Sequence, residues 1–184
     1  MILLSENLNV IFRSVEEYIL LVDSLLDYCL ILNERFTVKI RRSKLSESVQ
    51  KVINIVQDKI LAKKLNIKVK TKNLIPELWN TDQVRFEQVI FALLSNSIKF
   101  TYAAEISIKF HYFEDHDIIK ITVKDHGCGM DHEELARLNE LLADSNSLRT
   151  TQKISENSTG FGLGLTIAQS ILTKIAPEEL PGFR

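Results

Sequence analysis

Residues 105–129 have the sequence EISIKFHYFEDHDIIKITVKDHGCG, which predicts two β-strands that form a hairpin and lead into a glycine-rich turn. Apolar side chains occupy every second position on both sides of the polar segment Glu114–Asp117. These residues are Ile106, Ile108, Phe110, Tyr112, Ile119, Ile121 and Val123. Because side chains on a strand point alternately to opposite faces, the pattern predicts a sheet with one buried face and one wet face.

Two further alternating stretches, Phe36–Ile40 and Ile67–Thr71, predict additional strands. Apolar residues spaced three and four apart predict helices in the gaps. These helices are expected at about 49–60, 84–94, 131–143 and 163–175. Because the helices must cover the buried face of the sheet, we expect an α+β fold, a two-layer α/β sandwich with helices on one face.

The N-terminal segment carries a heptad-like pattern that predicts one long amphipathic helix. Its seam consists of Leu4, Leu8, Ile11, Val15, Tyr18, Val22, Leu25, Cys29 and Leu32, and a second stripe consists of Phe12, Ile19 and Leu26. A seam this wide needs more than one partner helix, as in a four-helix bundle, so we infer a dimer, a missing upstream helix, or both. The chain thus divides into a helix, residues 1–34, and a domain, residues 35–184.

Composition limits the partners of the chain. Its 184 residues suffice for one ordinary domain with a helical extension. Lys and Arg number 23 and Asp and Glu number 24, so the net charge is −1. This balance provides no global field for nucleic acid or an anionic membrane, and any phosphate binding must be local. Cys29 and Cys128 match no metal-site spacing, and charged residues interrupt the N-terminal apolar stretch before it is long enough to span a bilayer.

The segment Asp125–Gly129 directly follows a predicted strand. Its glycines at alternate positions, Gly127 and Gly129, allow a sharp turn and a close approach of the backbone to a ligand. A carboxylate at the strand end can accept hydrogen bonds from an amino group such as that of adenine. Taken alone, the segment also fits an ordinary turn with a capping aspartate.

The segment Gly160–Leu165 contains three glycines that open a predicted helix. Free backbone N–H groups and the positive end of the helix dipole are suited to phosphate oxygens. A dinucleotide-binding fold would need a strand just before the glycines, and a P-loop would need Gly-Lys-Ser/Thr, so neither reading applies. The preceding polar segment Ser145–Thr159 fits a mobile lid or an idle surface loop.

The predicted helix from Asp82 to about Phe100 brings Asn96 and Lys99 onto a face shared with Ala92. An amide oxygen is a hard ligand for Mg²⁺, and a lysine one turn further on can neutralise a phosphate. Taken singly, Asn96 and Lys99 also fit a solvated helix surface.

In order and spacing, these three segments closely resemble the nucleotide site of the histidine-kinase ATPase family, whose superfamily includes gyrase, mismatch-repair and heat-shock-chaperone ATPases. Asp82–Thr101 resembles the N box, Asp125–Gly129 the first glycine box and Gly160–Leu165 the second. The resemblance covers roughly residues 36–175 and implies a Bergerat-type ATP-binding fold with a mixed sheet. The heptad helix resembles the second helix of the family's dimerisation hairpin.

The resemblance implies a role for each matching residue. Asn96 would chelate Mg²⁺ against the triphosphate of ATP, and Lys99 would contact phosphate oxygens, which makes these two the catalytic residues. Asp125 would accept from the adenine amine, and the glycines would admit the base, form the hinge of the lid and cradle the phosphates. The implied nucleotide-binding residues are Asn96, Lys99, Phe100, Asp125, Gly127, Gly129, Gly160, Gly162, Leu163 and Gly164.

The implied reaction transfers the γ-phosphoryl group of ATP to a histidine, from which it later passes to an aspartate on a receiver domain. In such transfers the protein mainly positions groups and neutralises charge. The two distant cysteines suit a reducing compartment, so we expect a cytoplasmic location, with a parent protein that could be attached to a membrane. The wide seam of the N-terminal helix makes a homodimer through that helix the expected assembly. No nucleic-acid partner is expected.

The chain departs from the family pattern in several places. Ala92 stands where the family usually has an asparagine and where hydrolytic relatives have a glutamate that activates water. No clear aromatic F box lies between Gly129 and Gly160, and the family would continue into further strands beyond Arg184. The N-terminal helix has no histidine, and we assign no phosphotransfer role to the four that the chain contains. These are His111, His116, His126 and His132.

Three hypotheses follow. The leading one is the ATP-binding catalytic part of a histidine kinase, a fragment whose substrate histidine lies upstream or on another chain. The alternative is a catalytically inactive module for nucleotide binding and dimerisation, motivated by Ala92 and by the absent acceptor histidine. An ATPase of the gyrase or chaperone type is disfavoured, because alanine cannot act as a base.

Overall fold

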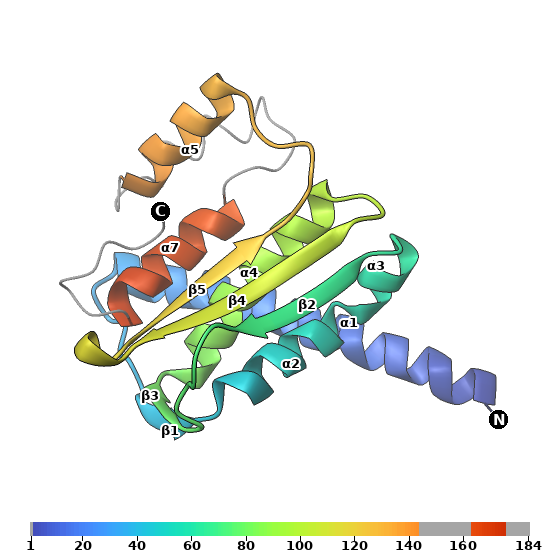
Figure 1. Cartoon of the computed structure of the whole chain (residues 1–184), viewed down its shortest axis with the longest axis horizontal. Helices are drawn as coiled ribbons and strands as arrows, with labels where there is room; N and C mark the ends of the chain where they lie inside the picture. The colour runs from blue at the N-terminus through green and yellow to red at the C-terminus, as the bar shows by residue number, and fades with distance from the viewer. Residues whose placement is uncertain (1, 144–162, 176–184) are drawn as a thin grey trace.

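The computed structural model describes residues 2–143 and 163–175 (Figure 1). The helices are α1 (Ile2–Leu32), α2 (Leu45–Ile55), α3 (Gln57–Ala62), α4 (Gln83–Phe100), α5 (His132–Ala143) and α7 (Leu163–Ile175). The strands are β1 (Arg41–Ser43), β2 (Asn66–Thr71), β3 (Trp79–Thr81), β4 (Glu105–Phe113) and β5 (Ile118–Lys124). No described helix, α1 included, combines the length and the hydropathy that a membrane span needs.

Strands β2, β4 and β5 form a mixed sheet with β4 in the centre. β2 pairs with β4 in parallel, and β4 pairs with β5 antiparallel, so the predicted hairpin is confirmed. The two strands are joined by a 3₁₀ turn, Glu114–His116, and by Asp117 with a left-handed φ of 51°. Aspartate tolerates this backbone conformation better than most residues. β1 and β3 pair antiparallel in a separate small sheet, which the sequence did not predict.

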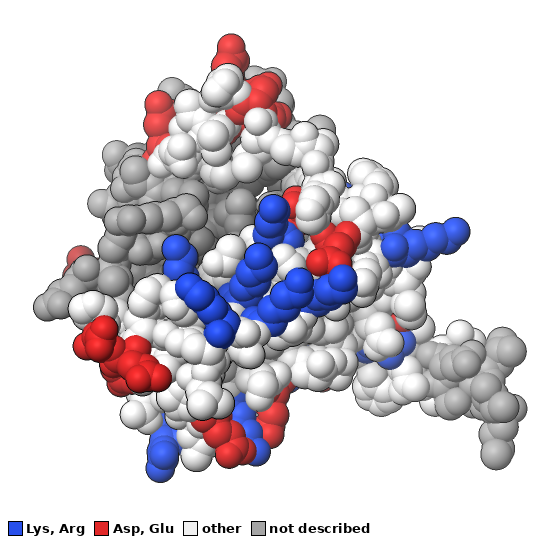
Figure 2. All heavy atoms as spheres, viewed as in Figure 1, with Lys and Arg blue, Asp and Glu red and all other residues white. Residues whose placement is uncertain are grey.

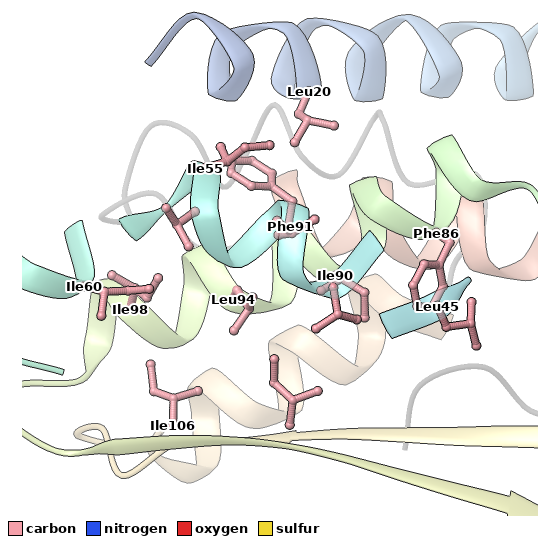
Figure 3. Packing of buried hydrophobic residues seen from close by; sticks show 14 of the residues in the cluster. Leu20, Leu45, Ile55, Ile60, Phe86, Ile90, Phe91, Leu94, Ile98 and Ile106 are labelled. Carbon is pink, nitrogen blue, oxygen red and sulfur yellow. The ribbon is translucent and has the colours of Figure 1, made fainter. Parts of the chain in front are cut away.

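Helices α2 and α4 cover one face of the main sheet, which confirms the two-layer sandwich (Figure 1). Ile90, Leu94 and Ile98 repeat every four residues along α4 and therefore lie on one side of it. They share one buried cluster with Ile106 and Ile108 of β4. Figure 3 shows this cluster between the helices and the strands. Because burying each such side chain contributes roughly 1.5–3 kcal/mol, this contact holds the two layers together.

Helix α1 lies over the helical layer, on the side away from the sheet (Figure 3). It packs against α2, α4 and α7. Leu20 joins the main core, whereas Tyr28 joins a second buried cluster with Val89 of α4 and Ile171 of α7. The second cluster thus fixes both α1 and α7 to α4.

Polar contacts complete the attachment of α1. The buried Asp27 carboxylate accepts from Arg85 Nη2 at 2.7 Å and from Gln88 Nε2 at 3.0 Å, both on α4. In the N-terminal half of α1, Arg13 donates to the two carboxylate oxygens of Asp58 on α3 at 2.8 and 2.9 Å. These pairs set the position of α1 along the domain as well as its rotation.

Most of the predicted heptad seam of α1 points away from the rest of the described chain, although Leu25 lies beside α4 and α7 and Leu32 packs against the second cluster. Ile11, Tyr18 and Val22 are 58%, 69% and 55% exposed. The helix instead turns a more polar side toward the domain, on which Leu20 and Tyr28 are the buried hydrophobic residues. The pattern therefore predicted the helix and its amphipathicity, while the apolar side stays exposed within the described chain.

The strand predicted at Phe36–Ile40 is wrong, because β1 begins only at Arg41. The backbone N–H of Lys39 donates to the Asp82 side chain at 2.7 Å instead of to a neighbouring strand. The Arg85 guanidinium lies 5.5 Å from the centre of the Phe36 ring. The alternation of apolar residues thus reflects a connecting segment that packs onto the start of α4.

The helix predicted at about 49–60 is two helices, since α2 ends at Ile55 and α3 begins at Gln57. Val56 between them has φ of −93° and ψ of 7°, outside the usual helical range. The apolar residues of the predicted pattern are nevertheless buried in the main core. Periodicity therefore identified the core face of this segment and missed the break.

Replacing the buried Asp27 by alanine should destabilise the fold by about 3 kcal/mol, because Arg85 would lose its buried partner. Urea denaturation followed by circular dichroism would measure the change. Glu16→Ala removes an exposed carboxylate from the same helix and should change stability by less than about 0.5 kcal/mol. Equal effects of the two substitutions would contradict the proposed attachment of α1 through Asp27.

Candidate functional site

The C-terminal end of α4 lies where three parts of the chain meet. The Lys63 ammonium, just after α3, donates to the carbonyl oxygens of Ile98 and Lys99, each at 2.7 Å. The N–H of Cys128, from the turn after β5, donates to the carbonyl oxygen of Phe100 at 3.3 Å. The last carbonyl groups of a helix have no partner within it, so these contacts fix the final turn of α4 against its surroundings.

Asp125 follows β5 directly, and two hydrogen bonds hold its carboxylate. Ser97 Oγ on α4 donates to one carboxylate oxygen and the Gly127 N–H donates to the other, both at 3.0 Å. Ser97 is buried and is the neighbour of Asn96 in sequence. Because each carboxylate oxygen has capacity for another donor, Asp125 can accept an amino group from a ligand while keeping both bonds.

The turn after Asp125 uses its two glycines for different reasons. A Cβ at Gly127 would lie 2.7 Å from the Phe100 carbonyl oxygen, which is too close for any real contact. Gly129 has a left-handed φ of 73°, which glycine adopts without strain, and a Cβ there would meet nothing within 4 Å. The close approach expected at Gly127 is therefore an approach to the end of α4, and it presses the turn against the helix that carries Asn96.

A cavity of about 380 Å³ lies between α1, α4 and α7. Ala92, Asn96 and Lys99 of α4 line it, so they share one face of the helix as predicted. Gly164 of α7 lines the same cavity. Apolar residues complete much of the wall, including Leu21, Leu25, Ile167, Ala168 and Ile171. Its volume falls within the range of small-molecule sites, which typically combine apolar walls with a few polar groups.

Two polar atoms in the wall of this cavity have no hydrogen-bond partner among the described residues, Gln88 Oε1 and Ser95 Oγ. Gln88 is only 1% exposed, and its amide nitrogen is held by Asp27, so the orientation of its oxygen is fixed. A buried polar atom without a partner is costly. The wall is therefore suited to a bound molecule, including water, that supplies hydrogen bonds.

The cavity also has a positively polarised side. Helix α7 begins at Leu163, so the free N–H groups of its first turn lie beside Gly164. The Lys99 ammonium adds a full charge and lies 5.0 Å from the centre of the Phe100 ring. A Cβ at Gly164 would meet nothing within 4 Å, so the space beside this backbone is open. This side of the cavity favours an anionic group.

The described candidate residues occupy two adjacent places. Asn96, Lys99 and Gly164 line the cavity, while Asp125 and Gly127 contact the same end of α4 from the turn after β5. Gly129 belongs to that turn, Phe100 ends α4 and Leu163 begins α7. Gly160, Gly162 and the polar segment Ser145–Thr159 lie outside the described residues.

Sequence reasoning missed two residues that build this site, Ser97 and Lys63. Ser97 could have been noticed, because a serine beside Asn96 on a helix faces away from the predicted ligand face and toward the sheet. No sequence pattern pointed to Lys63, because it lies 35 residues before the first carbonyl group that it contacts. Only the packing of α3 against the end of α4 brings it there.

The histidines form no alternative centre. Within residues 2–143 and 163–175, no group of three or more His, Cys, Asp or Glu residues is placed to hold a metal ion. His126 Nδ1 lies 2.9 Å from the Glu105 carbonyl oxygen, and His132 begins α5 as predicted.

Comparison with known proteins gives a family for this site. Residues 81–179 match the family described as histidine kinase-, DNA gyrase B-, and HSP90-like ATPase. The chain is 30% identical over 181 residues to the autoinducer 2 sensor kinase/phosphatase LuxQ of Vibrio vulnificus (strain YJ016). This match covers 95% of the chain and 20% of LuxQ, so the chain spans about a fifth of the length of that relative.

Solved structures share the fold. Histidine kinase AdeS of Acinetobacter baumannii superposes with a TM-score of 0.60 at 20% identity, over 83% of this chain and 64% of AdeS. Full-length ShkA, solved in complex with AMPPNP, gives a TM-score of 0.64 at 18% identity, over 85% of this chain and 31% of ShkA. At these identities the likeness concerns the fold alone.

Gly127→Ala should lower the free energy of unfolding by about 1–3 kcal/mol, because the added methyl group collides with the Phe100 carbonyl oxygen. Gly164→Ala is the matched control and should leave stability unchanged or raise it by up to about 1 kcal/mol, since alanine favours a helix. Thermal unfolding of the ligand-free variants would measure both. A Gly127→Ala variant as stable as the wild type would show that the turn does not press against α4.

Proposed function

Because this chain belongs to the histidine kinase-, DNA gyrase B-, and HSP90-like ATPase family, we propose that it binds Mg²⁺-ATP at the end of α4 and phosphorylates a histidine. It carries the ATP-binding catalytic domain of a histidine kinase. One observation supports the location most strongly. The Asp125 carboxylate is hydrogen-bonded to Ser97, one residue from Asn96, so the two predicted ends of the nucleotide site are joined by a single contact.

The purine binds at Asp125 in this proposal. The adenine amino group donates to a carboxylate oxygen, which keeps its existing bond to Ser97 or to the Gly127 N–H. Gly127 and Gly129 in this turn have no side chains that would block the approach of the adenine ring. Ligand specificity then comes from a carboxylate whose position the end of α4 fixes.

The triphosphate binds along the cavity face of α4. Asn96 supplies an amide oxygen, Lys99 supplies a positive charge, and the first turn of α7 supplies N–H groups beside Gly164. When bound, Mg²⁺ neutralises charge on the phosphates. The unpartnered Ser95 Oγ is a further group in the same wall that can bond to the ligand or to its waters.

The chemical step needs no covalent group from this domain. A nitrogen of the acceptor imidazole attacks the γ-phosphorus, the bond to the β,γ-bridging oxygen breaks, and ADP leaves with the negative charge of that oxygen. Lys99 and the α7 N–H groups stabilise this charge by being in place before the reaction. Ala92 provides no base at the cavity, so water is not activated and transfer to histidine is favoured over hydrolysis.

The acceptor histidine lies, in this proposal, on a helix that packs against the exposed seam of α1. This seam includes Val15, Tyr18 and Val22, each at least half exposed. An apolar stripe of this length is typical of a helix that joins a bundle. The partner helix belongs to the same protein or to the second copy in a homodimer, and the phosphoryl group then passes to an aspartate of a receiver domain in the cytoplasm.

Asp125→Asn should abolish the stabilisation that Mg²⁺-ATP gives to the wild type, because the adenine amine loses its carboxylate acceptor. At a ligand concentration of about 100 Kd, the wild type should gain about 2.7 kcal/mol, measured as a rise in melting temperature. The matched control is Asp117→Asn on the β4–β5 turn, which should respond to nucleotide as the wild type does. Equal stabilisation of wild type and Asp125→Asn would reject the purine site.

Transfer is tested by mixing the chain with a histidine-kinase hairpin that bears the acceptor histidine and with ATP labelled at the γ-phosphate. Acid-labile label on the hairpin is expected, and Asn96→Ala should reduce the rate on the order of 100-fold, as loss of one charge-stabilising group does in other enzymes. Nucleotide binding without transfer would instead favour the inactive module suggested by Ala92. Steady phosphate release without an acceptor would favour a gyrase-type ATPase.

A further inference from the structure

The open face of the main sheet carries six exposed lysines, which we call the lysine face. They are Lys68, Lys70, Lys72, Lys109, Lys120 and Lys124. The strand register places them together, because Lys109 lies opposite Lys70 on one side and Thr122 on the other. Figure 2 shows the resulting field of basic side chains over β2, β4 and β5. A chain with a net charge of −1 therefore presents one strongly basic surface.

Few acidic groups balance this charge. Glu105 is the carboxylate among the outward-facing positions of the paired strands, and it forms an ion pair with Lys68. Other acidic residues near the sheet lie at its two ends, in the turn Glu114–Asp117 and at Asp125, which follows β5 and whose carboxylate is bonded to Ser97 and Gly127. Figure 2 shows acidic side chains at the margins of the basic field. The centre of the lysine face thus has no compensating charge from the described residues around it.

The clustering of lysines on one face lowers the stability of the sheet. Lys70 and Lys109 are direct cross-strand partners, and like charges placed directly opposite each other destabilise a sheet. Partial burial lowers the pKa of His111, and charge repulsion from Lys72 and Lys120 lowers it further. A local conflict of this kind is expected where function requires it. A surface of opposite charge would relieve it.

The chemistry of the face distinguishes among polyanions. All six cations are lysines, whereas paired recognition of single phosphates or base edges favours the planar fork of arginine. The aromatic rings of the face, His111 and Phe113, lie in the last residues of β4 and pack on each other with 4.1 Å between ring centroids, so neither lies beside the central Lys70–Lys109 pair as a stacking platform for single-stranded bases. Two cavities, one between α1, α4 and α7 and one beside Asp58 on α3, lie among the helices on the other side of the sheet, so neither is a groove in the lysine face. An extended array of lysines across three paired strands matches a broad anionic plane.

We propose that the lysine face docks this domain onto a membrane surface that contains anionic lipids. Lysines near such a surface contribute mainly through electrostatic attraction to its negative potential. The cavity that contains Asn96 lies on the helical side of the sheet, so a docked domain keeps its candidate nucleotide site away from the lipid. Docking is therefore independent of nucleotide binding and does not rest on the proposed kinase activity.

The test is co-sedimentation of the full chain with vesicles of phosphatidylcholine, with and without phosphatidylglycerol, at low and at physiological ionic strength. We expect binding only to the anionic vesicles, weakened by salt. The triple substitution Lys109→Gln, Lys120→Gln and Lys124→Gln should weaken binding about 100-fold, since each lysine contributes roughly fivefold. Melting temperatures would verify that the variant is folded.

The matched control substitutes three exposed lysines away from the sheet, Lys39→Gln, Lys64→Gln and Lys174→Gln, with the same change in net charge. It should retain most of the binding. Equal loss in both triple variants would overturn the proposal, because the attraction would then be a property of the whole chain. So would equal binding to neutral vesicles, or binding to duplex DNA or to an acidic protein with none to anionic vesicles.

His111 gives a second readout at the face itself. Neutralising the field of Lys72 and Lys120 should raise the pKa of His111 when bicelles containing phosphatidylglycerol are added. Bicelles of phosphatidylcholine alone should leave it unchanged. The measurement is the pH dependence of the His111 ring resonances by NMR, and an unchanged pKa with anionic bicelles would count against contact at this face.

Discussion

The orientation of α4 about its own axis is the constraint on which the rest of the molecule depends. Ile90, Leu94 and Ile98 are buried against β4, and this burial fixes which side of the helix faces the sheet. Since successive residues on a helix are about 100° apart, Asn96 and Lys99 must then point toward α1 and α7. The contacts of Lys63 and Cys128 with the last turn keep this orientation up to the end of the helix. The apolar core thus determines where the polar site can form.

Much of the fold could be predicted because it depends on local periodicity. The alternation in β4 and β5 and the spacing of apolar residues in α4 each reflect one dominant contact, that between the sheet and the helical layer. The strand predicted at residues 36–40 is wrong, because the apolar pattern of this segment does not reflect a contact with the main sheet. The Phe36 ring packs against the Arg85 guanidinium, and the Lys39 N–H donates to the Asp82 side chain, so alternation there did not mean a strand.

The residues of the candidate site could be proposed from the sequence, whereas the tertiary contacts that hold them could not. Asn96 and Lys99 share a cavity as their spacing required, and Asp125 lies at the end of the same helix. The hydrogen bond from Ser97 and the contacts of Lys63 depend on tertiary packing, to which no sequence spacing corresponds. Gly127 was expected to admit a ligand, and its first role in the structure is to let the turn approach Phe100. One residue can serve both purposes, because the turn that it permits is the one that carries Asp125.

The domain has two distinct surfaces, one apolar on α1 and one basic on the open face of the sheet. The polar side of α1 is attached to α4 through Asp27, which leaves the part of the apolar seam from Ile11 to Val22 exposed. The wet face of the sheet, predicted only as solvated, concentrates the lysines although the chain as a whole is nearly neutral. The candidate nucleotide site lies among the helices between these two surfaces.

The central claim is that one nucleotide bridges Asp125, Asn96 and the start of α7. It is tested most directly by titrating the isotopically labelled chain with a Mg²⁺-bound, non-hydrolysable ATP analogue and following the backbone amides by NMR. The account predicts that the resonances of Asn96, Gly127 and Gly164 shift together along one binding curve, while those of the exposed strand residues Lys70 and Thr122 stay in place. Separate binding curves for these three residues, or no shift at Gly127 and Gly164, would contradict it.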